Sequence, residues 1–129
     1  MKGILITTND EVSIVDVETP LHVGINQILK SDIFELVHPM HLPQKTAMLV
    51  DEDGLFRKLP INQYGCFLYG TIQHGHPIVG DILLMKEGWT PDGPDLVDYP
   101  EEELQKQFDL ARAFTTHIKN FDRGMGGGI

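Results

Sequence analysis

The sequence predicts an α+β fold, in which a small, mostly antiparallel sheet packs with one short helix and one long amphipathic C-terminal helix. Three features of the 129-residue chain support this prediction. Thr46–Arg57 contains an apolar run followed by Asp-Glu-Asp-Gly, which is typical of a β-hairpin. Ile78–Met85 is almost continuously apolar, as expected for a buried strand. After Pro100, apolar residues recur every three to four positions, which is the period of an amphipathic helix.

The N-terminal segment is expected to form a hairpin. Gly3–Thr7 and Val12–Val17 both have the composition of short strands. Asn9 and Asp10 between them favour a tight turn. A tight turn joins antiparallel neighbours, so these two strands should pair.

A short helix is expected next, ending near Ser31. Thr19 is a candidate N-cap residue, and Pro20 is a candidate first helical residue. Gly24 within the helix lowers its propensity by up to about 1 kcal/mol relative to Ala. Its apolar face consists of Leu21, Ile25, Ile28 and Leu29.

The middle of the chain alternates strand-like segments with turns. Ile33–His38 has β-branched and aromatic residues that favour a strand, and Pro39–Lys45 is expected to be a loop. Leu59–Asn62 predicts a turn after the central hairpin. Tyr64–Gly70 mixes aromatic residues with glycines, and a strand and a short helix both remain open there.

The C-terminal part is expected to contain one loop and the long helix. Trp89–Tyr99 has two prolines, a glycine and three aspartates, which predict an exposed loop. Asp98 or Tyr99 is expected to cap the helix, with Pro100 in its first turn. The apolar stripe of the helix comprises Leu104, Phe108, Ala111, Phe114 or Thr115, Ile118 and Phe121. We expect one domain over residues 1–122 and a flexible glycine-rich tail over 123–129.

The charge balance argues against nucleic acid as a partner. The chain has 10 Lys and Arg against 19 Asp and Glu, which gives a formal net charge of −9. Nucleic-acid binding depends on clustered cations, and no cluster is larger than Arg57-Lys58. Much of the acidic charge lies in the predicted turn at 51–53 and in the approach to the last helix at 92–103.

The location expected from the sequence is the cytosol. The N-terminal apolar run is too short for a signal peptide or a membrane span. Cys66 is the single cysteine, so it has no partner for an intramolecular disulfide and suits a reducing compartment. Among its aromatic and aliphatic neighbours it is expected to be a small buried residue and not a nucleophile.

One group of polar and aromatic residues is a candidate ligand site. The cations Arg57 and Lys58 could bind a phosphate, and Tyr64 and Tyr69 could stack on a base. Asn62 supplies an amide to the same group. Arg112 or Lys119 of the last helix is a further candidate cation, contributed by another subunit. The alternative is a solvated strand end with a turn asparagine and two core tyrosines.

Two histidine pairs, His38/His41 and His74/His76, are the closest approach to a metal site. Together they could supply four nitrogen ligands to zinc. No His-x-x-Glu-His frame and no cysteine pair accompanies them, and no serine or cysteine lies in a recognisable nucleophile motif. We therefore expect no catalytic residues, no metal and no cofactor.

Three short motifs suggest a family. They are Val50–Leu55 (Val-Asp-Glu-Asp-Gly-Leu), Leu59–Asn62 (Leu-Pro-Ile-Asn) and Pro77–Ile82 (Pro-Ile-Val-Gly-Asp-Ile). Together with the N-terminal strand pair and helix, they resemble a family carried largely by phages and other mobile elements, catalogued as domain of unknown function 3846. The resemblance spans roughly residues 3–86, and the long C-terminal helix departs from the family's usual length. The family has no assigned reaction. The resemblance implies a small accessory protein of a phage or mobile element, of a kind that often counters host defence.

Three functions remain open. The first is a non-enzymatic, homo-oligomeric protein that binds and sequesters a small phosphorylated ligand such as a nucleotide signal. The second is an inhibitor that docks onto a host defence protein through its acidic surface or its last helix. The third is a metal-dependent hydrolase that uses the histidine pairs. The first is favoured because the Arg57-centred group is the only convergent set of polar residues.

Overall fold

The computed structural model describes the backbone of residues 1–41, 45–71 and 75–128, and the side chains of those residues as far as Asn120. The elements, in chain order, are β1 (Lys2–Ile6), β2 (Val12–Asp16), α1 (Leu21–Leu29), β3 (Phe34–Val37), β4 (Thr46–Asp51), α2 (Gln63–Tyr69), β5 (Ile82–Thr90), β6 (Gly93–Val97) and α4 (Glu101–Gly128). This is an α+β fold with a long C-terminal helix, as the sequence predicts.

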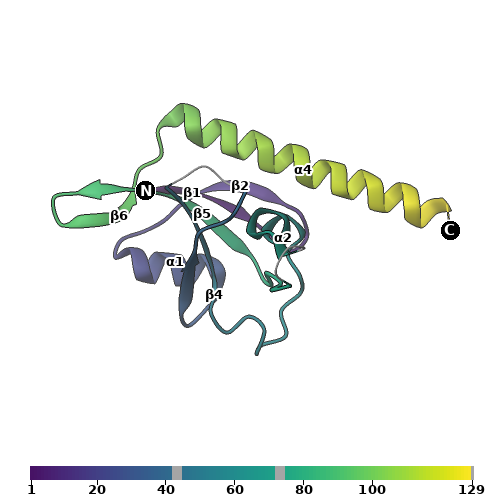
Figure 1. Cartoon of the computed structure of the whole chain (residues 1–129), viewed down its shortest axis with the longest axis horizontal. Helices are drawn as coiled ribbons and strands as arrows, with labels where there is room; N and C mark the ends of the chain where they lie inside the picture. Colours follow the sequence, from purple (N-terminus) through teal and green to yellow (C-terminus); the bar gives the residue numbers. More distant parts are fainter. Residues whose placement is uncertain (42–44, 72–74, 129) are drawn as a thin grey trace.

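The described strands form a single antiparallel sheet in the order β2-β1-β5-β4-β3. The sixth strand, β6, pairs with the second half of β5 and extends from the sheet as a hairpin (Figure 1). At Lys86, β5 pairs with β4 on one edge and with β6 on the other. The edge that pairs with β6 is the one that pairs with β1 in the first residues of β5. Three other strands, β1, β4 and β6, therefore pair with β5.

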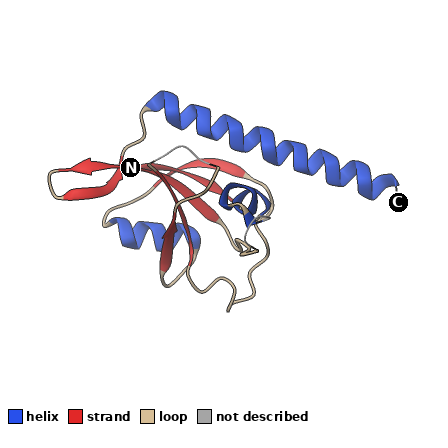
Figure 2. Ribbon diagram, viewed as in Figure 1, coloured by secondary structure: helices blue, strands red, loops and turns tan. Residues whose placement is uncertain are grey.

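The sheet is covered by helices on both faces (Figure 2). On one face Leu83 and Met85 pack with Ile25 and other apolar residues of α1. On the other face Ile82 and Leu84 pack in the cluster that includes side chains from α2 and α4. Because alternate residues of a strand point to opposite faces, the apolar run of β5 supplies both cores.

The N-terminal prediction is confirmed. Strands β1 and β2 pair from Lys2–Asp16 to Ile6–Val12. The turn between them includes Asp10, whose φ of 62° is the left-handed conformation that Asp tolerates better than most residues. The N-cap of α1 is Pro20 and not Thr19. Pro20 has an extended ψ of 142°, so the helical conformation begins one residue later than expected.

The predicted hairpin over Thr46–Arg57 is wrong. Its first half is β4, but that strand pairs with β3 and β5. After it, the Asp51 carboxylate accepts a hydrogen bond from the Asp53 backbone N–H at 2.9 Å, which winds the chain into a turn. Leu55 and Phe56, the expected second strand, lie in this turn and are 64% and 88% exposed. Asp53-Gly54 therefore marks a turn here, but the turn does not lead into a second strand of a hairpin.

The predicted strand Ile78–Met85 begins later than expected. Gly80 has a φ of 80° and interrupts the extended chain, so β5 starts at Ile82. Before it, Val79 makes only an isolated bridge with Ile61. The Asp81 carboxylate accepts a hydrogen bond from the Thr8 backbone N–H at 3.1 Å, which ties this bend to the first turn.

The exposed loop expected over Trp89–Tyr99 is also wrong, because β5 continues to Thr90 and β6 follows after a two-residue turn. The Thr90 hydroxyl closes the turn by donating to the Gly93 carbonyl at 2.8 Å. Pro94 lies within β6, opposite Trp89. Since β6 has one described strand neighbour, the missing N–H of proline is tolerated there.

The two remaining segments are helices. Tyr64–Gly70, left open by the sequence, contains most of α2, which begins after Asn62 and ends at Gly70. The apolar stripe of α4 packs as expected, with Leu104, Ala111 and Thr115 buried. The helix assignment extends to Gly128, and the side chain of Phe121 lies outside the described residues. The boundary of a flexible tail at Arg123 stays a prediction.

Candidate functional site

The candidate cation Arg57 has a structural contact. Its guanidinium donates to the carboxylate of Asp51, which is 6% exposed, and to the Lys30 carbonyl at 3.2 Å. These contacts fasten the turn after β4 to the end of α1. A ligand phosphate at Arg57 would have to compete with the buried carboxylate.

The candidate amide of Asn62 is fully buried. Its Oδ1 accepts a hydrogen bond from the Gly65 backbone N–H at 2.9 Å and so caps α2. Its Nδ2 donates to the carbonyls of Ile6 and Gly80, both at 3.0 Å. These bonds use the side-chain oxygen and both N–H groups within the fold, so Asn62 has no N–H left to donate to a ligand.

The other candidates lie apart from these two. Lys58 is exposed in a left-handed conformation with a φ of 57°. Tyr69 lines a cavity of about 250 Å³ that also contains three carboxylates, which disfavours an anionic ligand. Arg112 lies on α4 with its guanidinium 5.7 Å from the centre of the Phe108 ring. The residues expected to converge are therefore distributed over several parts of the molecule.

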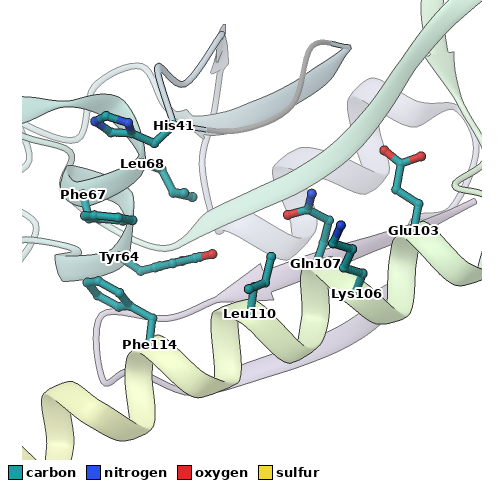
Figure 3. A pocket seen from close by; sticks show the side chains of 9 residues that line it. All are labelled: His41, Tyr64, Phe67, Leu68, Glu103, Lys106, Gln107, Leu110 and Phe114. Carbon is teal, nitrogen blue, oxygen red and sulfur yellow. The ribbon is translucent and has the colours of Figure 1, made fainter.

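Of the six candidate ligand residues, Tyr64 alone lines a pocket that is mostly apolar and aromatic. This pocket lies between α2 and α4 and has a volume of about 700 Å³ (Figure 3). Its lining residues are His41, Tyr64, Phe67, Leu68, Glu103, Lys106, Gln107, Leu110 and Phe114.

Aromatic rings form one wall of this pocket. Phe67 stacks on Phe114 with the ring centres 4.8 Å apart, and His41 stacks on Phe67 at 5.5 Å. Tyr64 contacts Phe114 with a centre-to-centre distance of 4.9 Å. Phe67 is 51% exposed, so part of this aromatic surface is open to a ligand. We call these four residues the aromatic wall.

The polar groups of the pocket are few and differ in exposure. Lys106 is exposed at its rim. Glu103 also lines it and accepts a hydrogen bond from Lys86 of β5 at 2.6 Å. Gln107 is only 2% exposed, and its Oε1 has no hydrogen-bond partner among the described residues.

Two buried tyrosines lie near this pocket. Burial raises the pKa of Tyr64 to about 12. Burial also raises the pKa of Tyr99, and the nearby charge of Glu103 and the neighbouring Tyr64 raise it further. Both phenols are neutral at physiological pH. The Tyr99 hydroxyl is a second buried polar atom without a partner in the described part of the chain.

The described histidines do not form a metal site. The Nε2 atom of His38 lies 2.6 Å from Glu87 Oε1 on β5, whereas His41 belongs to the aromatic wall. His74 lies outside the described residues. Among the side chains that the structure describes, no three His, Cys, Asp or Glu residues are placed to share a metal ion.

Gln107 was not predicted as a site residue, although the sequence contains a signal for it. It follows Leu104 by three positions and precedes Ala111 by four, so it lies on the apolar stripe of the last helix. A glutamine on a buried stripe needs a hydrogen-bond partner or a function. The aromatic wall could not be found in this way, because it joins residues from α2, α4 and the loop after β3.

None of the helices that the structure describes is a candidate membrane span. In the parts of the chain that the structure describes, none of them combines the length and the apolar character that crossing a bilayer requires.

Comparisons with known proteins bear on the family. No curated protein and no solved structure matches the chain significantly. A family model described as Domain of unknown function (DUF3846) matches residues 1–112. The match extends beyond the expected limit near residue 86 and includes β6 and the first part of α4. Since it covers most of the chain, the protein belongs to this family of domains of unknown function.

Proposed function

We propose that this protein is a non-enzymatic binding protein that sequesters a small ligand with a planar ring, of the nucleotide class, in the pocket between α2 and α4. The observation that carries the proposal is the aromatic wall, which is partly exposed on one side of a pocket of about 700 Å³. Pockets of roughly 300–1,000 Å³ hold small organic ligands.

Stacking would supply most of the affinity. The half-exposed ring of Phe67 and the ring of His41 line the pocket and offer aromatic surface to a ligand. Stacking of a nucleobase on an aromatic side chain contributes about 1–3 kcal/mol. Leu110, which is 51% exposed, supplies an apolar surface on the α4 side.

The phosphate would remain near the rim, where Lys106 is exposed. Attraction by this one lysine is weakened by the Glu103 carboxylate in the same pocket and by a net charge of −9. Contacts between exposed charges are screened by salt, whereas stacking is not. Binding should therefore depend only weakly on ionic strength, in contrast to a site built from several cations.

The biological role in this proposal is sequestration in the cytoplasm. A ligand held without chemical change is removed from its receptor, and this would suit an accessory protein of a phage or mobile element that counters a signalling defence. Homo-oligomerisation remains part of the same proposal.

Thermal melting with a panel of nucleosides and nucleotides tests the proposal. A ligand at 100 times its dissociation constant should stabilise the protein by about 2.7 kcal/mol. Phe67→Ala should weaken binding about 5-fold to 150-fold, because the lost stacking contributes about 1–3 kcal/mol. Phe56→Ala is the matched control, since Phe56 is 88% exposed and does not line the pocket.

Two results would contradict the proposal. If no ring-containing compound shifts the melting temperature, the pocket does not bind this class of ligand. If Arg57→Ala abolishes binding and Phe67→Ala does not, the ligand site lies elsewhere.

A protein inhibitor is the second candidate function. Phe67 and Leu110 are each 51% exposed and line the same pocket, so an apolar side chain of a partner could enter it. Absence of nucleotide binding, together with a purified host defence protein that binds the wild type and not Phe67→Ala, would favour this function.

A further inference from the structure

Gln107 lines the pocket and is buried, but no contact within the described part of the fold satisfies its side-chain oxygen. It occupies the inner stripe of α4, where its neighbours Leu104 and Ala111 are apolar and buried. Its side chain is 2% exposed, and no described residue donates a hydrogen bond to Oε1. A leucine at this position would avoid the loss of water from the amide.

The unpartnered oxygen faces the pocket. Gln107 lines it together with Tyr64 and Leu68. In Figure 3 the carboxamide oxygen is directed toward the side of the pocket where Leu68 and Tyr64 lie. A ring seated in the pocket could therefore reach this oxygen.

The chemistry of a carboxamide defines the ring edge that it would bind. Oε1 accepts a hydrogen bond and Nε2 donates one, so the matching edge carries an N–H donor beside an acceptor. The amino group and the adjacent ring nitrogen of adenine form such an edge, to which glutamine binds in a bidentate manner.

We propose that Gln107 is a specificity-determining residue, and that the ring it recognises carries an amino group next to a ring nitrogen, as in an adenine nucleotide. This inference rests on the function proposed above and adds the identity of the ring edge. The amino group donates to Oε1, and Nε2 donates to the ring nitrogen. A ring without the amino group would still stack on the aromatic wall, but would leave Oε1 unpaired.

Calorimetric titration of the full-length protein with two probes tests this inference. The probes are adenosine 5′-monophosphate and purine riboside 5′-monophosphate, which differ only in the amino group. The wild type should bind the amino compound at least about fivefold more tightly, because an unsatisfied buried group costs about 1–3 kcal/mol.

The variant Gln107→Leu should reduce this ratio to within about twofold. Its melting temperature should equal or exceed that of the wild type, because an unpaired buried amide is replaced by an apolar side chain. Gln105→Leu is the control on the same helix, since Gln105 is exposed and does not line this pocket. It should leave the ratio unchanged.

Each other outcome has a defined meaning. Equal binding of both probes by the wild type overturns the role of Gln107 and leaves the proposed function intact. An unchanged ratio in Gln107→Leu does the same. A marked loss of thermal stability in Gln107→Leu would show that the amide has a structural partner, which also overturns the inference. Failure of both probes and of every other ring compound to bind would overturn the proposed function itself.

Discussion

Asn62 shows how one side chain can join three segments of this fold. Its amide contacts the end of β1, the bend before β5 and the first turn of α2. The sequence places Asn62 beside cations and tyrosines, which is why it is a plausible ligand residue before the fold is known. Its local role as a turn residue is predictable, but the two distant carbonyls are not.

Asn62→Ala should destabilise the protein by about 2–4 kcal/mol. The change removes a helix cap, worth about 1 kcal/mol, and leaves two buried carbonyls without their donor. Denaturation in urea measures the loss. The control is Asn120→Ala, since Asn120 is exposed on α4 and should change stability by less than about 0.5 kcal/mol. A loss below about 1 kcal/mol for Asn62→Ala would contradict this structural role.

The short helix α1 shows a second limit of reasoning from sequence, at the scale of an element. Gly24 lowers helix propensity, and from the sequence it only weakens the prediction of a helix. In the structure its α-carbon packs against the chain that precedes the helix. A Cβ atom on Gly24 would overlap the Glu18 carbonyl oxygen and would lie 2.8 Å from the Glu18 nitrogen.

Gly24→Ala should therefore destabilise the protein by about 1–3 kcal/mol, although alanine is the better helix former by about 1 kcal/mol. The clash is with backbone atoms, which cannot move aside as a flexible side chain can. Thermal or urea unfolding tests the sign. Val23→Ala, on the exposed side of the same helix, should be neutral or slightly stabilising. Stabilisation by Gly24→Ala would show that the Glu18 backbone moves away.

The elements that the sequence predicted correctly are those with a strong periodic pattern. The stripe of α4 and the first strand pair belong to this group. The turn after Asp51 and the β5–β6 hairpin were mispredicted, because Asp, Gly and Pro mark a reversal of the chain but do not determine which element comes after it. Exposed Leu55 resembles the start of a strand, and Pro94 resembles a loop residue until its position at an edge is known.

At the scale of the whole molecule, α4 completes both a core and the candidate pocket. Leu104 and Ala111 belong to the core cluster on one face of the sheet. Phe114 contributes a ring to the aromatic wall, yet it lies beyond residue 112, where the family match ends. The pocket therefore depends on a segment that the family match does not include.

Truncation separates these roles. A chain that ends after Asn120 should retain its stability and its ligand binding. A chain that ends after Arg112 loses Phe114 and Thr115, a half-buried and a buried side chain, and should lose about 1–3 kcal/mol of stability. It should also lose binding of ring compounds. Circular dichroism melting and calorimetric titration measure the two effects. Retained binding by the chain that ends after Arg112 would exclude Phe114 from the site.

The uneven pairing of β5 gives one strand two levels of protection against amide hydrogen exchange. From Ile82 to Met85 the strand is buried and pairs with β1 or β4, and Leu83 and Leu84 have a strand neighbour on each side. From Gly88 to Thr90 it pairs with β6 alone, in a hairpin that projects from the sheet and carries Trp89 at 75% exposure. Amides in the first part should exchange only when the whole protein unfolds, whereas those in the hairpin should exchange through local opening. The boundary lies near Lys86 and Glu87, so the hairpin can open and close while the cores on both faces of the sheet remain folded.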